Sequence, residues 1–178
     1  MKRVTLMAGV LALALTGIWA VSAAQTKGAN FAGTWALDKA KSELPQMMQN
    51  IDSMSWIITQ DATQITRETK VEAGAAAPPG GGGRGMMGGG RPVTFKLDGT
   101  ETVVENPRGK AVHKVKWADD GKVLEISTVN TFDMQGETVT MSGMERWELA
   151  DGGATLKVWQ KRESPRGTTE SKMVFTKK

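Results

Sequence analysis

From Ser53 onward the chain is a succession of short runs in which apolar and polar residues alternate. The runs are rich in Val, Ile, Thr and Trp and recur every 8 to 14 residues, which is typical of β-strands. Clusters of turn-forming residues separate them: QDAT at 60–63, DG at 98–99, NPRG at 106–109, DDG at 119–121, MQGE at 134–137, DGG at 151–153 and SPRG at 164–167. A helical turn or two is expected only around 42–50. The pattern therefore predicts an antiparallel meander.

The register of these runs gives a sharper prediction, because side chains directly opposite each other in a hairpin lie on one face of the sheet. Folding TVTMSGMERWEL back through DGG sets Leu149 against Leu156 and Trp147 against Val158. The same inward parity survives the other turns. The further expected pairs are Glu145–Gln160, Val139–Phe132, Glu145–Ile126, Trp147–Leu124, Trp117–Leu124, Val115–Ile126, His113–Thr128, Ala111–Val104, Leu97–Thr100, Phe95–Thr102, Trp56–Arg67, Ile58–Ile65, Met173–Val158 and Phe175–Leu156.

Consecutive antiparallel strands form either an open sheet with exposed edges or a closed barrel. Closure removes the edges, so we expect an all-β fold: an up-and-down meander closed into a barrel of about eight to ten strands, with a short helical turn near the N-terminus. Seven side chains should then converge on one interior: Trp56, Phe95, Trp117, Leu124, Trp147, Val158 and Phe175.

Two segments are expected to stand outside this domain. Residues 1–24 combine the basic pair Lys2 and Arg3, an apolar run and a small-residue exit, which is typical of a secretory signal peptide. The apolar run is short for an uncleaved membrane anchor. Residues 74–92, GAAAPPGGGGRGMMGGGRP, have the composition of a flexible insertion and are expected to be disordered. A phosphate-binding loop would need Gly-Lys-Ser/Thr and a helix after the glycines, but here Val93 begins a strand pattern.

These boundaries predict one domain over residues 25–178 in a periplasmic or secreted protein. The chain has no cysteine, so neither acylation of a cysteine nor a disulfide is expected. Without Lys2 and Arg3, 21 basic residues stand against 19 acidic ones, a balance of +2 spread along the chain. That charge does not indicate a nucleic-acid partner, and no stable membrane span is expected after cleavage. We expect a monomer.

The triplet Gly33-Thr34-Trp35 on the first expected strand resembles the Gly-x-Trp motif of the lipocalins and related calycin barrels. The stretches FAGTWALDKAKSE, KVLEISTVNTF, MERWELADGGATLKV, ESPRG and KMVFTKK are similar to small exported lipocalin-like proteins of bacteria, a mostly uncharacterised family. The resemblance covers most of residues 30–178. It implies a barrel whose interior takes a small apolar or amphipathic ligand, and it makes Trp35 the plug of the closed end. Read from the residues alone, Trp35 is an ordinary core tryptophan.

The residue types in this sequence give little indication of catalytic activity. His113 is the one histidine, and the chain lacks cysteine and a Gly-x-Ser-x-Gly elbow, so the sequence indicates neither a thiol nor a standard hydroxyl nucleophile. One imidazole cannot form a histidine-rich zinc site. Methionines can bind copper(I), but Met141 and Met144 fall on opposite strand faces, and core packing explains them better. We predict no enzyme, no metal and no cofactor.

The informative polar residues on the inner parity form the candidate ligand-binding set: Arg67, His113, Glu145, Gln160 and Arg162. Because an unpaired buried charge is costly, each must be paired, lie near a mouth or face a wet cavity. In one interpretation the cluster orients a ligand's polar head group, since an arginine fork suits a carboxylate or phosphate. In the other, Arg162 pairs with Glu145 and Arg67 emerges at the rim.

The sequence therefore favours an exported, non-catalytic lipocalin-like protein that binds a small hydrophobic or amphipathic ligand in its barrel. The alternative is a structural or interaction protein of the cell envelope, with a filled barrel core and no ligand.

Overall fold

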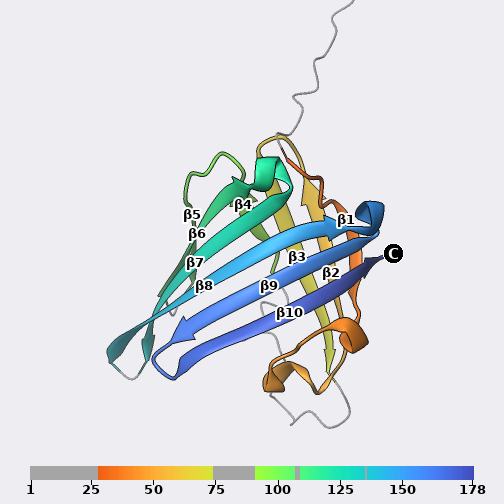
Figure 1. Cartoon of the computed structure of the whole chain (residues 1–178). Helices are drawn as coiled ribbons and strands as arrows, with labels where there is room; N and C mark the ends of the chain where they lie inside the picture. Colours follow the sequence, from red (N-terminus) through yellow and green to blue (C-terminus); the bar gives the residue numbers. More distant parts are fainter. Residues whose placement is uncertain (1–27, 74–90, 107–108, 135) are drawn as a thin grey trace, which may run out of the picture.

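The computed structural model describes residues 28–73, 91–106, 109–134 and 136–178, and nearly all of them belong to one antiparallel sheet (Figure 1). The expected signal peptide and nearly all of the glycine-rich insertion lie outside these ranges. The ten strands are β1 (Gly33–Leu37), β2 (Ile51–Gln60), β3 (Gln64–Ala73), β4 (Val93–Lys96), β5 (Thr102–Asn106), β6 (Gly109–Ala118), β7 (Val123–Met134), β8 (Glu137–Ala150), β9 (Thr155–Ser164) and β10 (Gly167–Lys177).

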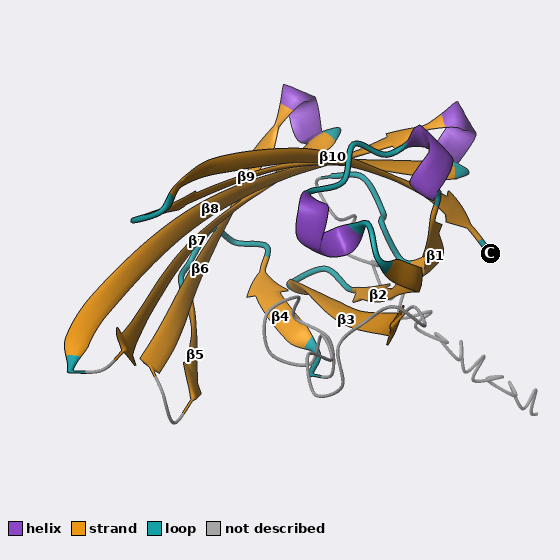
Figure 2. Ribbon diagram, turned by 90° about the horizontal axis from the view of Figure 1, so that it is seen from below, coloured by secondary structure: helices purple, strands orange, loops and turns teal. Residues whose placement is uncertain are grey.

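The strands form a nearly closed barrel. Their order in the sheet is β4-β3-β2-β1-β10-β9-β8-β7-β6-β5, so the first and last strands of the chain are neighbours. Figure 2 shows the long strands β6 to β10 curving over β2, β3 and β4. The seam of the barrel lies between β4 and β5, which form the two ends of the sheet. The all-β meander predicted from the sequence is thus confirmed.

The predicted register is confirmed through most of the sheet. Every expected pair from Val104–Ala111 to Phe175–Leu156 recurs in the ladders of β5 to β10. Six of the seven side chains expected to converge are buried in one core, and Trp117 packs against it partly buried. Because the inward parity is kept across these turns, the polar residues described below lie on the inner face of the barrel.

Two hairpins at the same end of the barrel turn through backbone with positive φ. The β6–β7 turn, η3 (Asp119–Gly121), has φ values of 49°, 53° and 85°, and the β8–β9 turn, η4 (Asp151–Gly153), has 53°, 66° and 91°. Glycine adopts this region without a steric penalty, and aspartate tolerates it better than most residues. The DDG and DGG clusters are therefore suited to these turns.

The β2–β3 hairpin differs from the prediction by two residues. Trp56 lies opposite Thr69 and Ile58 opposite Arg67, whereas the sequence reading paired Trp56 with Arg67. The cause lies in the turn, where the Asp61 Oδ1 atom accepts hydrogen bonds from the backbone N–H groups of residues 63 and 64, at 2.7 and 2.9 Å. These bonds move the turn one residue toward the C-terminus, but a shift of two keeps each side chain on its face.

The expected β4–β5 hairpin is absent as a hydrogen-bonded ladder. No Leu97–Thr100 or Phe95–Thr102 pairing is formed between these described strands. Instead, the Lys96 backbone N–H donates to the Thr102 hydroxyl at 3.3 Å, and Asp98 caps the N–H and hydroxyl of Thr100 at 2.9 and 2.7 Å. These local bonds compete with strand pairing, so the chain turns here without joining the two edges.

The N-terminal segment closes one end of the barrel. Phe31 is fully buried, 6.2 Å from the Trp117 ring and 5.9 Å from the Trp147 ring. Gln60 fixes the segment by accepting from the Phe31 N–H at 2.9 Å and donating to the Ala29 carbonyl at 3.0 Å. Trp35 is also fully buried and donates to the Phe31 carbonyl at 2.9 Å, so Phe31 occupies the end of the barrel with Trp35 beside it.

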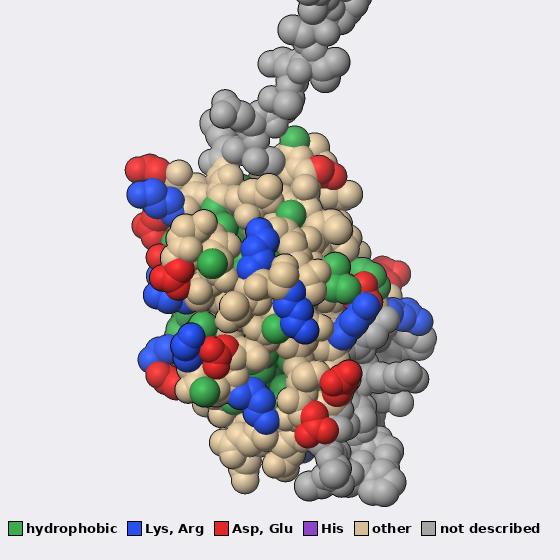
Figure 3. Space-filling model, turned by 90° about the vertical axis from the view of Figure 1, so that its right-hand side faces the viewer, with side chains coloured by type: hydrophobic (Ala, Val, Ile, Leu, Met, Phe, Trp, Pro, Cys, Tyr) green, Lys and Arg blue, Asp and Glu red, His purple; other side chains and the backbone are tan. Residues whose placement is uncertain are grey.

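The predicted helical turn near the N-terminus appears as two short 3₁₀ turns, η1 (Lys39–Lys41) and η2 (Gln46–Met48). Within the described ranges, no helix has the length and apolar character needed to cross a bilayer. Figure 3 shows one side of the molecule, on which basic and acidic side chains are interspersed rather than gathered by sign.

Candidate functional site on the inner face of the barrel

The inner face of β5 to β10 changes from apolar to polar and back to apolar along the strands. Three successive bands can be read from the register. The first band, at the closed end of the barrel, is the buried core around Trp147. The next, which we call the polar belt, consists of Arg67, His113, Thr128, Glu145, Gln160 and Arg162. The third, which we call the apolar rim, consists of Val104, Ala111, Phe132, Val139 and Met141, with one polar residue, Asn130, between Ala111 and Met141.

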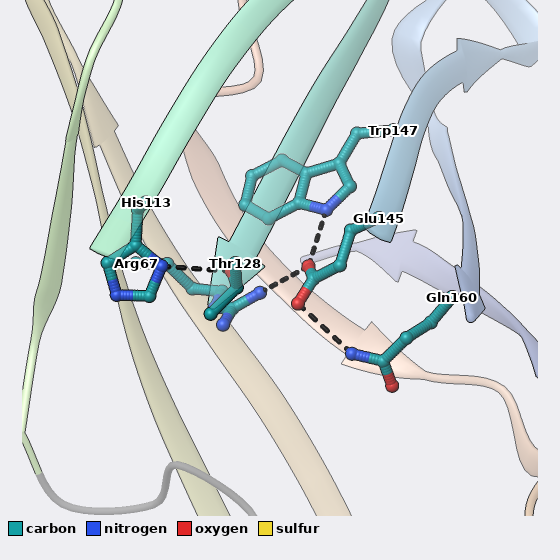
Figure 4. Close-up of polar contacts among 6 residues, drawn as sticks. All are labelled: Arg67, His113, Thr128, Glu145, Trp147 and Gln160. Atoms are coloured by element: carbon teal, nitrogen blue, oxygen red, sulfur yellow. Dashed lines mark hydrogen bonds and ion pairs between the residues drawn. The ribbon is translucent and has the colours of Figure 1, made fainter. Parts of the chain in front are cut away.

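Glu145 is the centre of the polar belt (Figure 4). Its side chain is only 12% exposed, and three side chains donate hydrogen bonds to its carboxylate. Arg67 Nη1 and Trp147 Nε1 reach Oε2 at 2.7 and 2.9 Å, and Gln160 Nε2 reaches Oε1 at 3.0 Å. A buried carboxylate with this many donors is held in one orientation.

Arg67 reaches Glu145 from the opposite side of the barrel, since β3 and β8 are not neighbours in the sheet. Its guanidinium lies over three aromatic rings, 4.6 Å from the Trp56 centroid, 5.4 Å from Trp147 and 5.7 Å from Phe95. Stacking against aromatic faces favours a desolvated guanidinium. Arg67 Nε is nevertheless buried without a hydrogen-bond partner among the described residues.

Opposing effects act on the pKa of Glu145. Burial by itself raises the pKa of this carboxyl, but the Arg67 guanidinium and the hydrogen bond from Trp147 outweigh it and hold the pKa below its ordinary value. Glu145 is therefore ionised at neutral pH, and its charge cancels that of Arg67.

His113 lies at the edge of the polar belt, on β6. Its Nδ1 atom is 2.9 Å from the Thr128 hydroxyl, and its ring meets Phe95 edge to face at 5.1 Å. Burial lowers the pKa of His113, and repulsion from the Arg67 guanidinium lowers it further against a weaker opposite effect of Glu145. The imidazole is therefore neutral at pH 7.

Arg162 differs from the other members of the polar belt because its side chain is exposed. It stands opposite Gly143 on β8 and Thr169 on β10, so it shares the inward parity. It forms no ion pair with any described residue. The structure thus pairs Glu145 with Arg67, and Arg162 lies nearer the solvent-exposed end of the inner face. This corrects the interpretation in which Arg162 pairs with Glu145 and Arg67 emerges at the rim. The reason is that Gln160, two residues before Arg162, takes the place opposite Glu145.

The apolar rim is incompletely covered. Val104 is 39% exposed although it shares the parity of the core, and Phe132, Val139 and Met141 are half-buried. The same parity that gives complete burial around Trp147 therefore leaves apolar side chains in contact with solvent farther along the strands. The inner face is fully buried at the closed end and partly exposed to solvent at the other.

Sequence reasoning did not include Thr128 in the candidate set and did not identify Trp147 as a hydrogen-bond donor to Glu145. Thr128 could have been found from its predicted place opposite His113, and Trp147 from its place two residues after Glu145 on one face. No local signal in the sequence reveals that Trp56 and Phe95 enclose Arg67, because that contact depends on the curvature of the barrel. Among the described residues, no group of three or more His, Asp or Glu side chains is placed to bind a metal ion.

Comparison with known proteins gives one resemblance of fold. No protein-family model matches the chain, and no curated protein matches it. Among solved structures, the chain is similar to the zebrafish ileal bile acid-binding protein complexed with cholic acid, at 16% sequence identity and a TM-score of 0.46 over 83% of this chain and 98% of that one. The protein described here is classed as a ten-stranded, nearly closed antiparallel barrel with a charged inner belt. This assignment depends on the strand pairing of the described residues and not on that similarity.

Proposed function

We propose that this protein binds a small amphipathic ligand on the inner face of the barrel, with the ligand's polar head at the polar belt and its apolar body on the apolar rim. The observation that supports this most is the partial exposure of Val104, Phe132, Val139 and Met141 on the core-facing parity. Exposed apolar surface next to fixed polar groups is typical of ligand sites.

The charges of the polar belt favour an anionic head group. Arg67 and Glu145 neutralise each other, and His113 is neutral, so Arg162 supplies the remaining charge of the polar belt. A guanidinium binds carboxylates and phosphates through charge-assisted hydrogen bonds. Because Arg162 is exposed, its contribution should be modest and sensitive to salt.

The proposal is tested with three probes that share one chain and differ in the head group: decanoate, decanol and decyltrimethylammonium, each below its aggregation limit. Calorimetric titration should give the tightest binding for decanoate, in the range of about 1–100 µM. Arg162→Gln should weaken decanoate about 3- to 10-fold and leave decanol unchanged. Arg166→Gln, in the exposed β9–β10 turn, is the matched control.

A second pair of variants separates the two faces of the sheet. Met141→Asp, in the apolar rim, should weaken all three probes by about tenfold or more. Met144→Asp, on the outer face of the same strand, should leave them unchanged. Equal losses in both variants, or no binding of any probe, would contradict the proposal.

A second candidate is an interaction protein of the cell envelope with no ligand, and one observation favours it. Val103, Val129 and Met144 are 53%, 43% and 39% exposed on the outer faces of β5, β7 and β8. A ligand-free wild type that self-associates in sedimentation velocity, and Val129→Asp that does not, would favour this candidate over ligand binding.

We also propose that the protein acts outside the cytoplasm and without catalysis. The support is the basic, apolar and small-residue order of residues 1–24 and the residue types described above. Mass spectrometry of the protein from its own host should give the mass of a chain that begins at Gln25.

A further inference from the structure

The outer face of the barrel has a hollow of about 450 Å³ whose chemistry differs from that of the inner face. It is lined by Asp119, Val123, Arg146, Glu148, Lys157 and Trp159. Most of these side chains project from adjacent outward positions of β7, β8 and β9, where Val123 stands opposite Glu148, Glu148 opposite Lys157, and Arg146 opposite Trp159. The outer face of these strands is turned toward the viewer in Figure 1.

The hollow has an apolar floor and one aromatic plate. Val123 is only 5% exposed, and the large indole of Trp159 is half-buried on an outward position. Neighbouring strands are about 4.8 Å apart, and successive outward residues about 7 Å apart. Three strands and two such rows therefore give an area of about 10 by 7 Å, which suits one or two six-membered rings.

Polar groups of both signs surround this plate. Arg146 is held from two sides, with Nη2 3.6 Å from Asp119 Oδ2 and Nε 3.4 Å from Glu125 Oε1. Asp119 reaches it from the η3 turn, where its backbone φ is 49°. Glu148 and Lys157 stand opposite each other but form no ion pair with a described residue. Both donors and acceptors are thus available at the edge of the plate.

This balance of charges selects the class of ligand. Asp119 and Glu148 would repel an anion, and Arg146 and Lys157 would repel a cation. A purely apolar molecule would desolvate charged groups without replacing their hydrogen bonds. A sugar ring has an apolar C–H face for the indole and hydroxyl groups that donate and accept at its edge.

We propose that this hollow is a binding site for a neutral sugar ring, with Trp159 as its stacking platform. The site is independent of the polar belt, because its side chains point to the opposite side of the sheet. Sugar binding at the outer face and amphiphile binding at the inner face therefore succeed or fail separately.

The experiment follows the Trp159 indole N–H by NMR, with the resonance identified by Trp159→Phe. The probes are methyl glucoside, methyl galactoside and N-acetylglucosamine, with inorganic phosphate and tetramethylammonium as charged probes. At least one sugar should give a saturable shift with a Kd of about 1–20 mM. Trp159→Ala should weaken binding of that sugar about tenfold or more, measured by saturation transfer to the sugar protons, and Glu148→Gln about threefold. Lys114→Ala, an exposed outer residue of β6 that does not line the hollow, should leave it unchanged.

Three results would overturn the proposal: no saturable shift with any sugar up to about 50 mM, stronger binding of phosphate or tetramethylammonium than of every sugar, or unchanged sugar binding in the Trp159→Ala variant. If Trp159→Ala does not fold, as judged by circular dichroism, the double variant Glu148→Ala with Lys157→Ala decides the question, since it keeps the indole and removes the hydrogen-bonding groups of both side chains. Unchanged sugar binding in that double variant would likewise overturn the proposal.

Discussion

The Arg67–Glu145 pair offers the most demanding test of the site, because both side chains are largely buried, at 15% and 12% exposed, and their charged atoms are 2.7 Å apart. Removing one partner of a buried ion pair costs about 3–5 kcal/mol. The residual exposure places this pair at the lower end of that range. We expect Glu145→Gln to lower the free energy of unfolding by about 3 kcal/mol at pH 7.5, because the guanidinium cannot lose its proton and keeps its charge among three aromatic rings.

Arg67→Met should cost somewhat less, about 2–3 kcal/mol at pH 7.5, and its cost should shrink as the pH falls. Without the guanidinium, burial raises the pKa of the Glu145 carboxyl, so this group can take up a proton and become neutral. The double variant should be more stable than the sum of the single effects predicts, by about 2 kcal/mol or more. Urea denaturation of all four proteins at pH 7.5 and 5.5 measures these quantities.

The control for this cycle is the exposed pair Glu43–Lys172, whose charged atoms are 3.1 Å apart with side chains 72% and 62% exposed. Its coupling should be about 0.5 kcal/mol or less. A coupling of that size for Arg67–Glu145 would refute the argument that burial makes the inner pair strong.

Two further predictions concern pH and backbone. The folded-state pKa of His113 is depressed below its unfolded value of 6.5, so His113 contributes stability above pH 6.5 that is lost as the pH falls toward the folded-state pKa, with a slope of at most about 1.4 kcal/mol per pH unit. His113→Gln should remove that part of the slope in urea titrations between pH 7.5 and 5.0, and an unchanged slope would contradict it. Gly109 has φ of 153°, and a Cβ there would collide with the Thr131 carbonyl on β7, so Gly109→Ala should lower the free energy of unfolding by about 1–3 kcal/mol. Gly136→Ala, at a positive-φ position with open space around it, is the comparison, and equal losses would refute the collision argument.

The sequence predicted the meander and most of its register because both depend on a period of two. Once Trp147 is taken as inward, each short turn carries the parity to the next strand, and the polar residues of the inner face follow from it. The prediction failed where side chains changed a turn. Asp61 moved the β2–β3 register, and Asp98 and Thr102 replaced the expected β4–β5 pairing by local hydrogen bonds.

The partners within the site could not be predicted in the same way. Arg67 and Glu145 are 78 residues apart in the sequence and lie on strands that are not neighbours, so no rule of register relates them. Their contact depends on how strongly the sheet curves, and the curvature reflects the packing of the whole core. Phe31 is similar, because it precedes the first strand and belongs to no periodic pattern.

The composition of the inner face is difficult to explain by stability alone. A buried ion pair can often be replaced by apolar residues without loss of stability, and the neighbouring apolar rim leaves Val104 and Met141 partly exposed, which favours aggregation rather than folding. A belt of charge between a filled core and an exposed apolar surface is expected if the surface is covered by a ligand whose head the belt orients. The Arg67→Met, Glu145→Gln double variant distinguishes these explanations. If the belt serves binding, this variant should bind both decanoate and decanol more weakly than the wild type while Arg162 keeps the preference for decanoate, whereas unchanged affinity for both probes would mean that the pair only supports the fold.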